Sequence, residues 1–353
     1  MTIKNSTGIK THRDHFVLDF DRKKLVQRLE KFQDLSISDK EVETLFEIQD
    51  TRDWKLSKRR HAFAGDSLWK KCLTACLYRP FDLRAYCHHD DIVELPRHEI
   101  MQHMLADNNL ALSTTRSTEI GRGWEHVFCS ENVIQHHTVS LKETNYLFPL
   151  YLYPETEAER AMGMTRRPNL SQPFLYDITD RLGYTPTPEA IFYYIYALFH
   201  SPIYRTRYAD FLKIDFPRVP LTSDNTLFTQ LATLGEKLVQ LHLMKSPKLT
   251  QKKAQPKFID NGGDRMVDPG QPKFINGNVI INKKGDAFTQ VPETIWNFHI
   301  GGYQVCHKWL KDRKGRQLSP EDIQHYQQIV VALGETIQIM AAIDQAIPAW
   351  PIQ

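Results

Sequence analysis

The stretch PEAIFYYIYALFHSPIYRTRYADFLKIDFPRVPL, residues 188–221, decides where the core of this chain lies. Its first part has apolar residues at the three- and four-residue spacing of one helix face, and Pro188 followed by Glu189 fits a helix start. Ser201-Pro202 predicts a break, because proline disfavours α geometry in the residue before it. A second short helix follows, and two prolines near the end impose an extended exit. Two helices this apolar have to bury their faces, so we expect them at the centre of the fold.

The composition bounds the class of protein. The chain has 353 residues, of which 41% are apolar and 25% charged, which suits one large or two modest domains and argues against disorder. The net charge of +3 makes no case for nucleic acid by itself, so a DNA-binding chain would have to gather its positive charge on one face. Five cysteines, an odd number without a CxxC pair, favour a reduced, cytoplasmic protein. No apolar run reaches membrane-spanning length, so we expect no membrane association.

Helical periodicity recurs along the chain. Ser38 and Glu41 have the spacing of a capping box, and residues 225–244 have a sustained apolar face. The clearest helix runs from Ser319 to Ile343, with Pro320 in its first turn. We expect it to pack against 188–212 and 225–244. Shorter helices are predicted at 38–48, 68–77, 97–106 and 173–182, whereas 54–60 is predicted to be a connector.

Residues 109–150 have the alternation of β-strands, and this is the part best suited to reading DNA. Arg116 lies at the end of a predicted strand, and Arg122 is held between two glycines with Trp124 beside it. A loop on a β-rich surface can place such side chains against base edges. The alternative is a solvated arginine and a core tryptophan, and the sequence leaves both open.

Two further basic stretches are candidates for DNA contacts. Arg166 and Arg167 lie in the proline-bearing stretch 154–188, which is predicted to be a long loop. Lys252 and Lys253 belong to a lysine-rich run that follows a predicted helix, where solvated charge is the ordinary interpretation and a phosphate-binding arm the functional one. The tetrapeptide PKFI occurs at 256–259 and again at 272–275, and both copies are predicted to be strands of a small hairpin region.

The chain resembles the C-terminal specificity region, or target recognition domain, of Type ISP restriction-modification enzymes and related fused adenine methylases. The resemblance begins at SPIYRTRYADFLKIDFPRVPL and extends, in the family's order, over most of the chain. The other matching pieces are GIKTHRDHFVLDFD (8–21), YRPFDLRAYCHHD (78–90), NLALSTTRS (109–117), FPLYLYP (148–154) and the segment from IWNFHIGGYQ to IMAAID (295–344). The first residues already lie within such a piece, so we expect a fragment, a split subunit or a remnant of a longer protein.

The resemblance implies a DNA sequence-recognition region that positions duplex DNA for an adenine methyltransferase and a nuclease or translocase, in cis or in trans. It implies an α+β fold, with a β-rich DNA-reading part joined to a helical scaffold that has long C-terminal helices. We expect a connector at 1–57, the recognition part at 58–153, and the scaffold at 154–353 with a strand and loop insertion near 246–292.

The chemistry-bearing motifs of an enzyme are not found in the sequence. There is no (D/N)PP(Y/F) loop for a flipped base and no GxxxxGK(S/T) loop for a nucleotide. We therefore expect a non-catalytic chain that needs no cofactor and binds no metal. Two alternatives stay open: a protein-interaction or vestigial module that does not bind DNA, and a metal-dependent hydrolase that would use His88, His89, Asp90 and Asp91.

Overall fold

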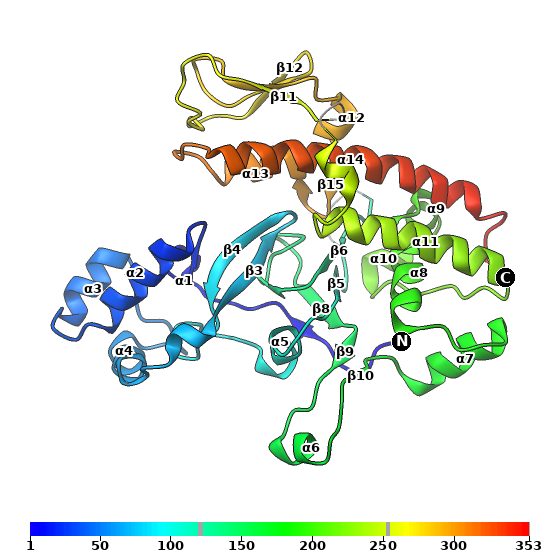
Figure 1. Cartoon of the computed structure of the whole chain (residues 1–353), viewed down its shortest axis with the longest axis horizontal. Coiled ribbons are helices and arrows are strands. Elements are labelled where there is room, and N and C mark those ends of the chain that lie inside the picture. Colours follow the sequence, from blue (N-terminus) through cyan, green and yellow to red (C-terminus); the bar gives the residue numbers. More distant parts are fainter. Residues whose placement is uncertain (119–122, 252–254, 353) are drawn as a thin grey trace.

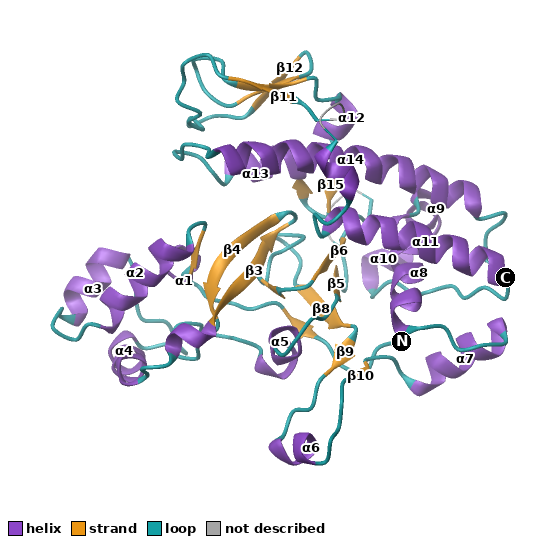
Figure 2. Ribbon diagram, viewed as in Figure 1, coloured by secondary structure: helices purple, strands orange, loops and turns teal. Residues whose placement is uncertain are grey.

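The computed structural model describes residues 1–118, 123–251 and 255–352, and its fold is α+β, as the sequence predicts. Several small sheets lie beside helices that come mainly from the C-terminal half (Figures 1 and 2). The helices of the first half are α1 (Asp14–Val17), α2 (Arg22–Gln33), α3 (Asp39–Phe46), α4 (Leu56–Gly65), the 3-10 helix η1 (Trp69–Cys72), α5 (His98–Leu105) and α6 (Glu157–Ala161). Those of the second half are α7 (Gln172–Leu182), α8 (Pro188–His200), α9 (Pro202–Arg207), α10 (Ala209–Ile214), α11 (Asn225–His242), the 3-10 helix η2 (Pro247–Thr250), α12 (Glu293–Trp296), α13 (Val305–Lys311) and α14 (Pro320–Ala346).

Helix α8 is the centre of the helical part, and it begins where the sequence predicts. The Thr187 hydroxyl accepts the Ala190 N–H and Pro188 occupies the first turn. The helix packs closely on α11, because a Cβ atom at Gly235 of α11 would lie 1.8 Å from the carbonyl oxygen of Tyr193. Only glycine allows the two backbones to approach this far.

Helix α14 also begins as predicted, with Ser319 and Asp322 forming a capping box. It packs against α8, α9 and α11, which confirms the predicted partners. Its length and composition would suit a membrane span, but its buried stripe in the core accounts for the same apolar residues.

The predicted β-rich stretch supplies three strands of a sheet of order β1-β8-β5-β6, in which all pairs are antiparallel. Its strands are β1 (Ser6–Thr7), β5 (Ala111–Thr115), β6 (Val127–Ser130) and β8 (Asn145–Pro149). All five residues of β5 are buried, and neighbouring strands pair with both of its edges. Next to this sheet, β9 (Tyr151–Leu152) and β10 (Arg167–Pro168) form a two-stranded ribbon.

A second sheet has the order β2-β4-β3-β7. This sheet and the helix α4 that precedes β3 in the chain correct two predictions. Its strands are β2 (Leu18–Asp19), β3 (Leu73–Arg79), β4 (Asp82–Cys87) and β7 (Val133–Ile134). The predicted helix at 68–77 is wrong, because its first half holds only the 3-10 helix η1 and its second half is β3, which pairs with β4 through a tight turn at Pro80-Phe81. The predicted connector at 54–60 is also wrong, since α4 begins at Leu56.

Two more sheets lie near the C-terminal helices. The strands β11 (Lys257–Ile259), β12 (Lys273–Ile275), β13 (Asn278–Ile280) and β14 (Ala287–Thr289) form a sheet of order β11-β14-β13-β12. Both PKFI copies are therefore strands, as predicted, and they form the two edges of one sheet. The second is a hairpin of β15 (His299–Ile300) and β16 (Tyr303–Gln304).

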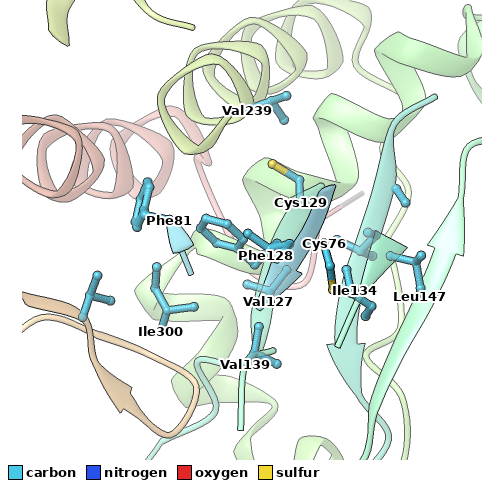
Figure 3. Packing of buried hydrophobic residues seen from close by; sticks show 14 of the residues in the cluster. Cys76, Phe81, Val127, Phe128, Cys129, Ile134, Val139, Leu147, Val239 and Ile300 are labelled. Atoms are coloured by element: carbon cyan, nitrogen blue, oxygen red, sulfur yellow. The ribbon is translucent and has the colours of Figure 1, made fainter. Parts of the chain in front are cut away.

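One hydrophobic core joins the sheets to the helices. Figure 3 shows Phe81 and Phe128 beside Ile300, with Val239 of α11 close to Cys129. The five cysteines are free thiols, and Cys76 is a buried member of this core. Strands β1 and β2 pair with β8 and β4, so sheet hydrogen bonds tie the first twenty residues to the later chain. The division at 57 and 153 stays a prediction.

Candidate nucleic-acid interface

The connection between β5 and β6 leaves the end of the first sheet, and the protein holds both of its ends. The N–H of Thr118 donates to the carbonyl of Lys213 at 3.2 Å, and the N–H of Gly301 donates to the carbonyl of Glu125 at 2.8 Å. A Cβ at Gly301 would lie 2.0 Å from the carbonyl oxygen of Val139, so this approach also needs a glycine. Residues 119–122, which include the candidate Arg122, lie outside the described residues.

Arg116 lies just beyond β5, where the sequence placed it, and its side chain is 65% exposed. Its Nε atom is 3.3 Å from Oδ1 of Asp215, which follows α10. The N–H of Phe216 and the Arg116 guanidinium lower the pKa of Asp215, so this carboxylate is charged at neutral pH. Arg116 is thus accessible to a phosphate or a base edge, and the exposed carboxylate of Asp215 would compete with such a ligand for its guanidinium group.

Trp124 is a correction to the expected DNA contacts. Its side chain is 3% exposed, and its ring packs edge-on against Phe199 of α8 at 5.8 Å between centroids. The buried guanidinium of Arg205 lies 5.9 Å from the same ring. The core interpretation that the sequence left open therefore fits Trp124, which fixes the base of the loop and is not proposed as a contact.

A hollow opens next to the Arg116–Asp215 pair. It has a volume of about 420 Å³, and Asp215, Arg218 and Thr114 are polar groups on its wall. A second hollow of about 370 Å³ lies against the same extended segment, 215–219, and is lined mainly by aromatic and aliphatic side chains of α9 and α10. Phe216 anchors the segment, because its ring packs edge-on against Tyr146 and Phe148 of β8.

A separate arm connects β9 to β10 and stands away from the body, with α6 at its far end (Figure 1). Arg166 and Arg167 lie at the root of this arm, where Arg167 pairs with Leu152 in the ribbon. Both are exposed. Arg166 lies over the ring of Tyr151 at 4.1 Å and donates to the carbonyl of Asn108. The stretch 154–188 consists of this arm followed by α7, which confirms the short helix predicted at 173–182.

The structure describes only part of the lysine-rich run that follows α11. Lys252 and Lys253 lie outside the described residues. Of their neighbours, Lys245 pairs with Glu131 at 2.5 Å, and Lys248 pairs with Glu335. These two lysines therefore tie the run to β6 and α14, and a phosphate-binding role for Lys252 and Lys253 stays a prediction.

The corner at residues 78–90 is held by buried charge. Asp82 accepts from Arg84 at 2.8 Å and from Arg313 at 3.0 Å. Arg79 donates instead to the carbonyl of Tyr78 and to Oε1 of Gln135. The Asp82–Arg313 pair joins β4 to the chain between α13 and α14.

The residues of the possible hydrolase form a row of structural contacts. The hydroxyl of Tyr86 is 3.0 Å from Nδ1 of His88, Nε2 of His88 is 3.3 Å from Nδ1 of His98, and His98 contacts Asp90. Burial lowers the pKa of His88 to about 4, and Tyr86 is fully buried. His89 pairs instead with Asp66. Among the described residues, no group of three or more His, Cys, Asp or Glu side chains is arranged to hold a metal ion.

The fold and these surfaces define an α+β module in which small sheets project loops and an arginine-bearing arm from a helical scaffold. The family model described as the Type ISP C-terminal specificity domain matches residues 3–342, so the chain belongs to that family. No curated protein matches the sequence.

Three solved structures have the same fold. The ATP-dependent Type ISP restriction-modification enzyme LlaBIII bound to DNA is 17% identical, with a TM-score of 0.73 over 100% of this chain and 24% of that one. A DrdV–DNA complex is 18% identical, with a TM-score of 0.72 over 96% of this chain and 36% of the other. A nuclease-deletion mutant of the Type ISP enzyme LlaGI, in complex with a DNA substrate mimic, is 18% identical, with a TM-score of 0.67 over 100% of this chain and 33% of that one. The chain therefore spans about a third or less of the length of these proteins.

The sequence did not predict the ion pair between Arg116 and Asp215. Asp215 is 99 residues from Arg116, and no local pattern relates the two. The composition of the arm, in contrast, can be read from the sequence, because Arg160, Met162 and Met164 lie close to Arg166 and Arg167.

Proposed function

We propose that this chain is the DNA target-recognition region of a restriction-modification system, which holds duplex DNA for a methyltransferase and a nuclease or translocase. Those catalytic domains would be supplied by the same polypeptide or by a partner, and the chain itself would carry out no reaction. The observation that carries the proposal is the family match over residues 3–342. The fold shared with three DNA-bound proteins supports it. Five free thiols are compatible with the cytoplasmic location that we propose.

Within this function, we propose that Arg116, Arg166 and Arg167 contact DNA. All three are exposed, and guanidinium groups bind phosphates and guanine edges with two hydrogen bonds. Arg122, Lys252 and Lys253 remain proposals on the strength of the sequence alone. The β-rich part at 58–153 would supply base contacts and the helices of 154–353 the support.

The test is a titration of a fluorescent, mixed-sequence duplex with the full chain at about 50 and about 200 mM salt. Binding should weaken steeply with salt, because each phosphate contact releases counterions and adds about 0.9 to the slope of log K against log salt. Replacing Arg116, Arg166 and Arg167 by glutamine should flatten that slope. Absence of salt-dependent binding by the unaltered chain would favour the interaction or vestigial module instead.

A further inference from the structure

The ion pair between Arg116 and Asp215 leaves most of the arginine's donors unused. Asp215 accepts from Nε of Arg116 at 3.3 Å, and among the described residues the Arg116 side chain has no second hydrogen-bond partner. Other exposed arginines that pair with an acid spend a terminal nitrogen as well. Arg52 gives Nε and Nη2 to Asp53, and Arg181 uses Nε and Nη1. Arg116 therefore keeps both terminal amino groups, Nη1 and Nη2, for a ligand.

Both partners of this pair extend from fixed backbone. Arg116 directly follows β5, and two residues later the N–H of Thr118 donates to the carbonyl of Lys213 at 3.2 Å. Phe216 fixes the other side, because its ring packs edge-on against two rings of β8 and its N–H donates to the carboxylate of Asp215. A guanidinium that an anchored carboxylate holds at Nε presents its two amino groups in a defined direction.

We propose that Arg116 reads a guanine in the DNA sequence that the protein recognises, and that Asp215 is the positioning residue that orients it. Two adjacent donors need two adjacent acceptors, and in the major groove only guanine presents such a pair, N7 and O6. Adenine, cytosine and thymine edges each lack the second acceptor. The inference rests on the proposed function and adds to it one base and the residue that reads it.

The carboxylate decides between a base and a phosphate. The N–H of Phe216 and the guanidinium of Arg116 lower the pKa of Asp215, so it is charged at neutral pH. A phosphate bound to Nη1 and Nη2 would bring a second negative charge to the same guanidinium, and the two anions would repel each other. The edge of guanine carries no net charge and avoids this repulsion. Arg116 is thus directed to a base while Asp215 is present, and is free to bind a phosphate without it.

The first experiment selects DNA from a pool of duplexes with a randomised central segment, using the full chain at low salt. The unaltered chain should enrich a sequence in which at least one G·C pair is required. Arg116→Gln should lose that requirement and keep the others, because the amide of glutamine matches adenine rather than guanine. On the enriched duplex, exchanging this G·C pair should weaken binding by the unaltered chain about 5- to 150-fold, the range for one bidentate contact.

A modified base tests the contact itself. The base 7-deazaguanine lacks the N7 acceptor but still pairs with cytosine. Placed at the position found by selection, it should weaken binding by the unaltered chain about tenfold, because one hydrogen bond to a charged group is lost. The same exchange should leave the affinity of Arg116→Gln unchanged. Fluorescence anisotropy gives these affinities, and repeating them at two salt concentrations gives the salt slope.

A second variant tests the positioning role. Asp215→Asn should relax the same G·C requirement although Arg116 is intact, and it should steepen the salt slope by about 0.9, because the released arginine can bind a phosphate. Asp53→Asn is the matched control, since Asp53 also pairs with an exposed arginine, and it should change neither the enriched sequence nor the slope. Arg116 and Asp215 are 65% and 52% exposed, so all these variants should unfold at the midpoint of the unaltered chain.

The guanine contact is refuted if the enriched sequence requires no G·C pair, if Arg116→Gln keeps the requirement, or if 7-deazaguanine binds as well as guanine. An unchanged requirement in Asp215→Asn would refute the positioning role. Failure of the proposed function itself looks different, because the unaltered chain would then enrich no sequence and bind no duplex in a salt-dependent way.

Discussion

Replacing Asp82 by alanine should destabilise the protein more than almost any other single charge removal. Asp82 is 1% exposed and accepts hydrogen bonds from Arg84 and Arg313, whose side chains are also largely buried. Burial alone would raise the pKa of Asp82, but the two guanidinium groups hold it below its ordinary value. The alanine variant therefore leaves two arginines without their main counter-charge in the interior.

The magnitude follows from this geometry. Removing one partner of a buried ion pair costs about 3–5 kcal/mol, and Asp322, 3.6 Å from Arg313, keeps the loss near about 3 kcal/mol. An unfolding entropy of about 2.1 cal/mol/K per residue over 353 residues gives about 0.7 kcal/mol/K. The midpoint of thermal unfolding should then fall by about 4 °C.

Differential scanning calorimetry at neutral pH measures this change. Asp53→Ala is the control, because the Arg52–Asp53 pair is exposed and its loss should leave the midpoint unchanged. The double variant Asp82→Leu/Arg313→Met should recover part of the loss, since it removes Asp82 together with the more deeply buried of its two arginine partners. A midpoint for Asp82→Ala within about 1 °C of the unaltered chain would refute the reasoning.

Three further predictions concern stability and binding. Burial lowers the pKa of His88 to about 4 and of His242 to about 3, so the unfolded chain takes up protons first as the pH falls below about 6.5. Stability contributed by these histidines is complete above that pH and is lost towards pH 4; urea midpoints at pH 7.5 and 5 that are equal would contradict this. Gly235→Ala should cost about 1–3 kcal/mol or more, because the added methyl meets the backbone of α8, whereas Gly65→Ala, with open space around it, should be neutral by the same calorimetry. Asp215→Asn should strengthen DNA binding and steepen its salt dependence by releasing Arg116, and weaker binding in the anisotropy titration would show that the pair itself is needed.

The helices that the sequence predicted well are those with local start signals. Thr187-Pro188 and Ser319-Pro320 each combine a capping hydroxyl with a proline in the first turn, and both helices begin there. The segment 68–77 failed because its apolar spacing fits a helix locally, while its hydrogen bonds go to β4 across the Pro80-Phe81 turn. Pairing with another strand outweighed local periodicity, which no window of ten residues can reveal.

The candidate interface was predictable to a similar extent. Arg116 is exposed at the end of a strand because the alternation of 109–117 correctly placed that strand. Trp124 looked equally suited to a surface or a core, and the partner that decided the matter, Phe199, lies on α8. Long-range packing therefore separates the buried aromatic residue from the exposed arginine, although the two are eight residues apart.

The exposed segment that follows α6 in the arm, residues 161–165, has a consequence for how such proteins diversify. The N–H of Tyr153 donates to Nδ1 of His103, the side chain of Asn169 donates to the carbonyl of Pro149, and Thr156 forms a capping box, whereas the side chains of residues 161–165 are exposed. Those positions can change their chemistry almost without loss of stability. Exchanges in this short segment would therefore change the surface that the protein presents while the interior stays as it is.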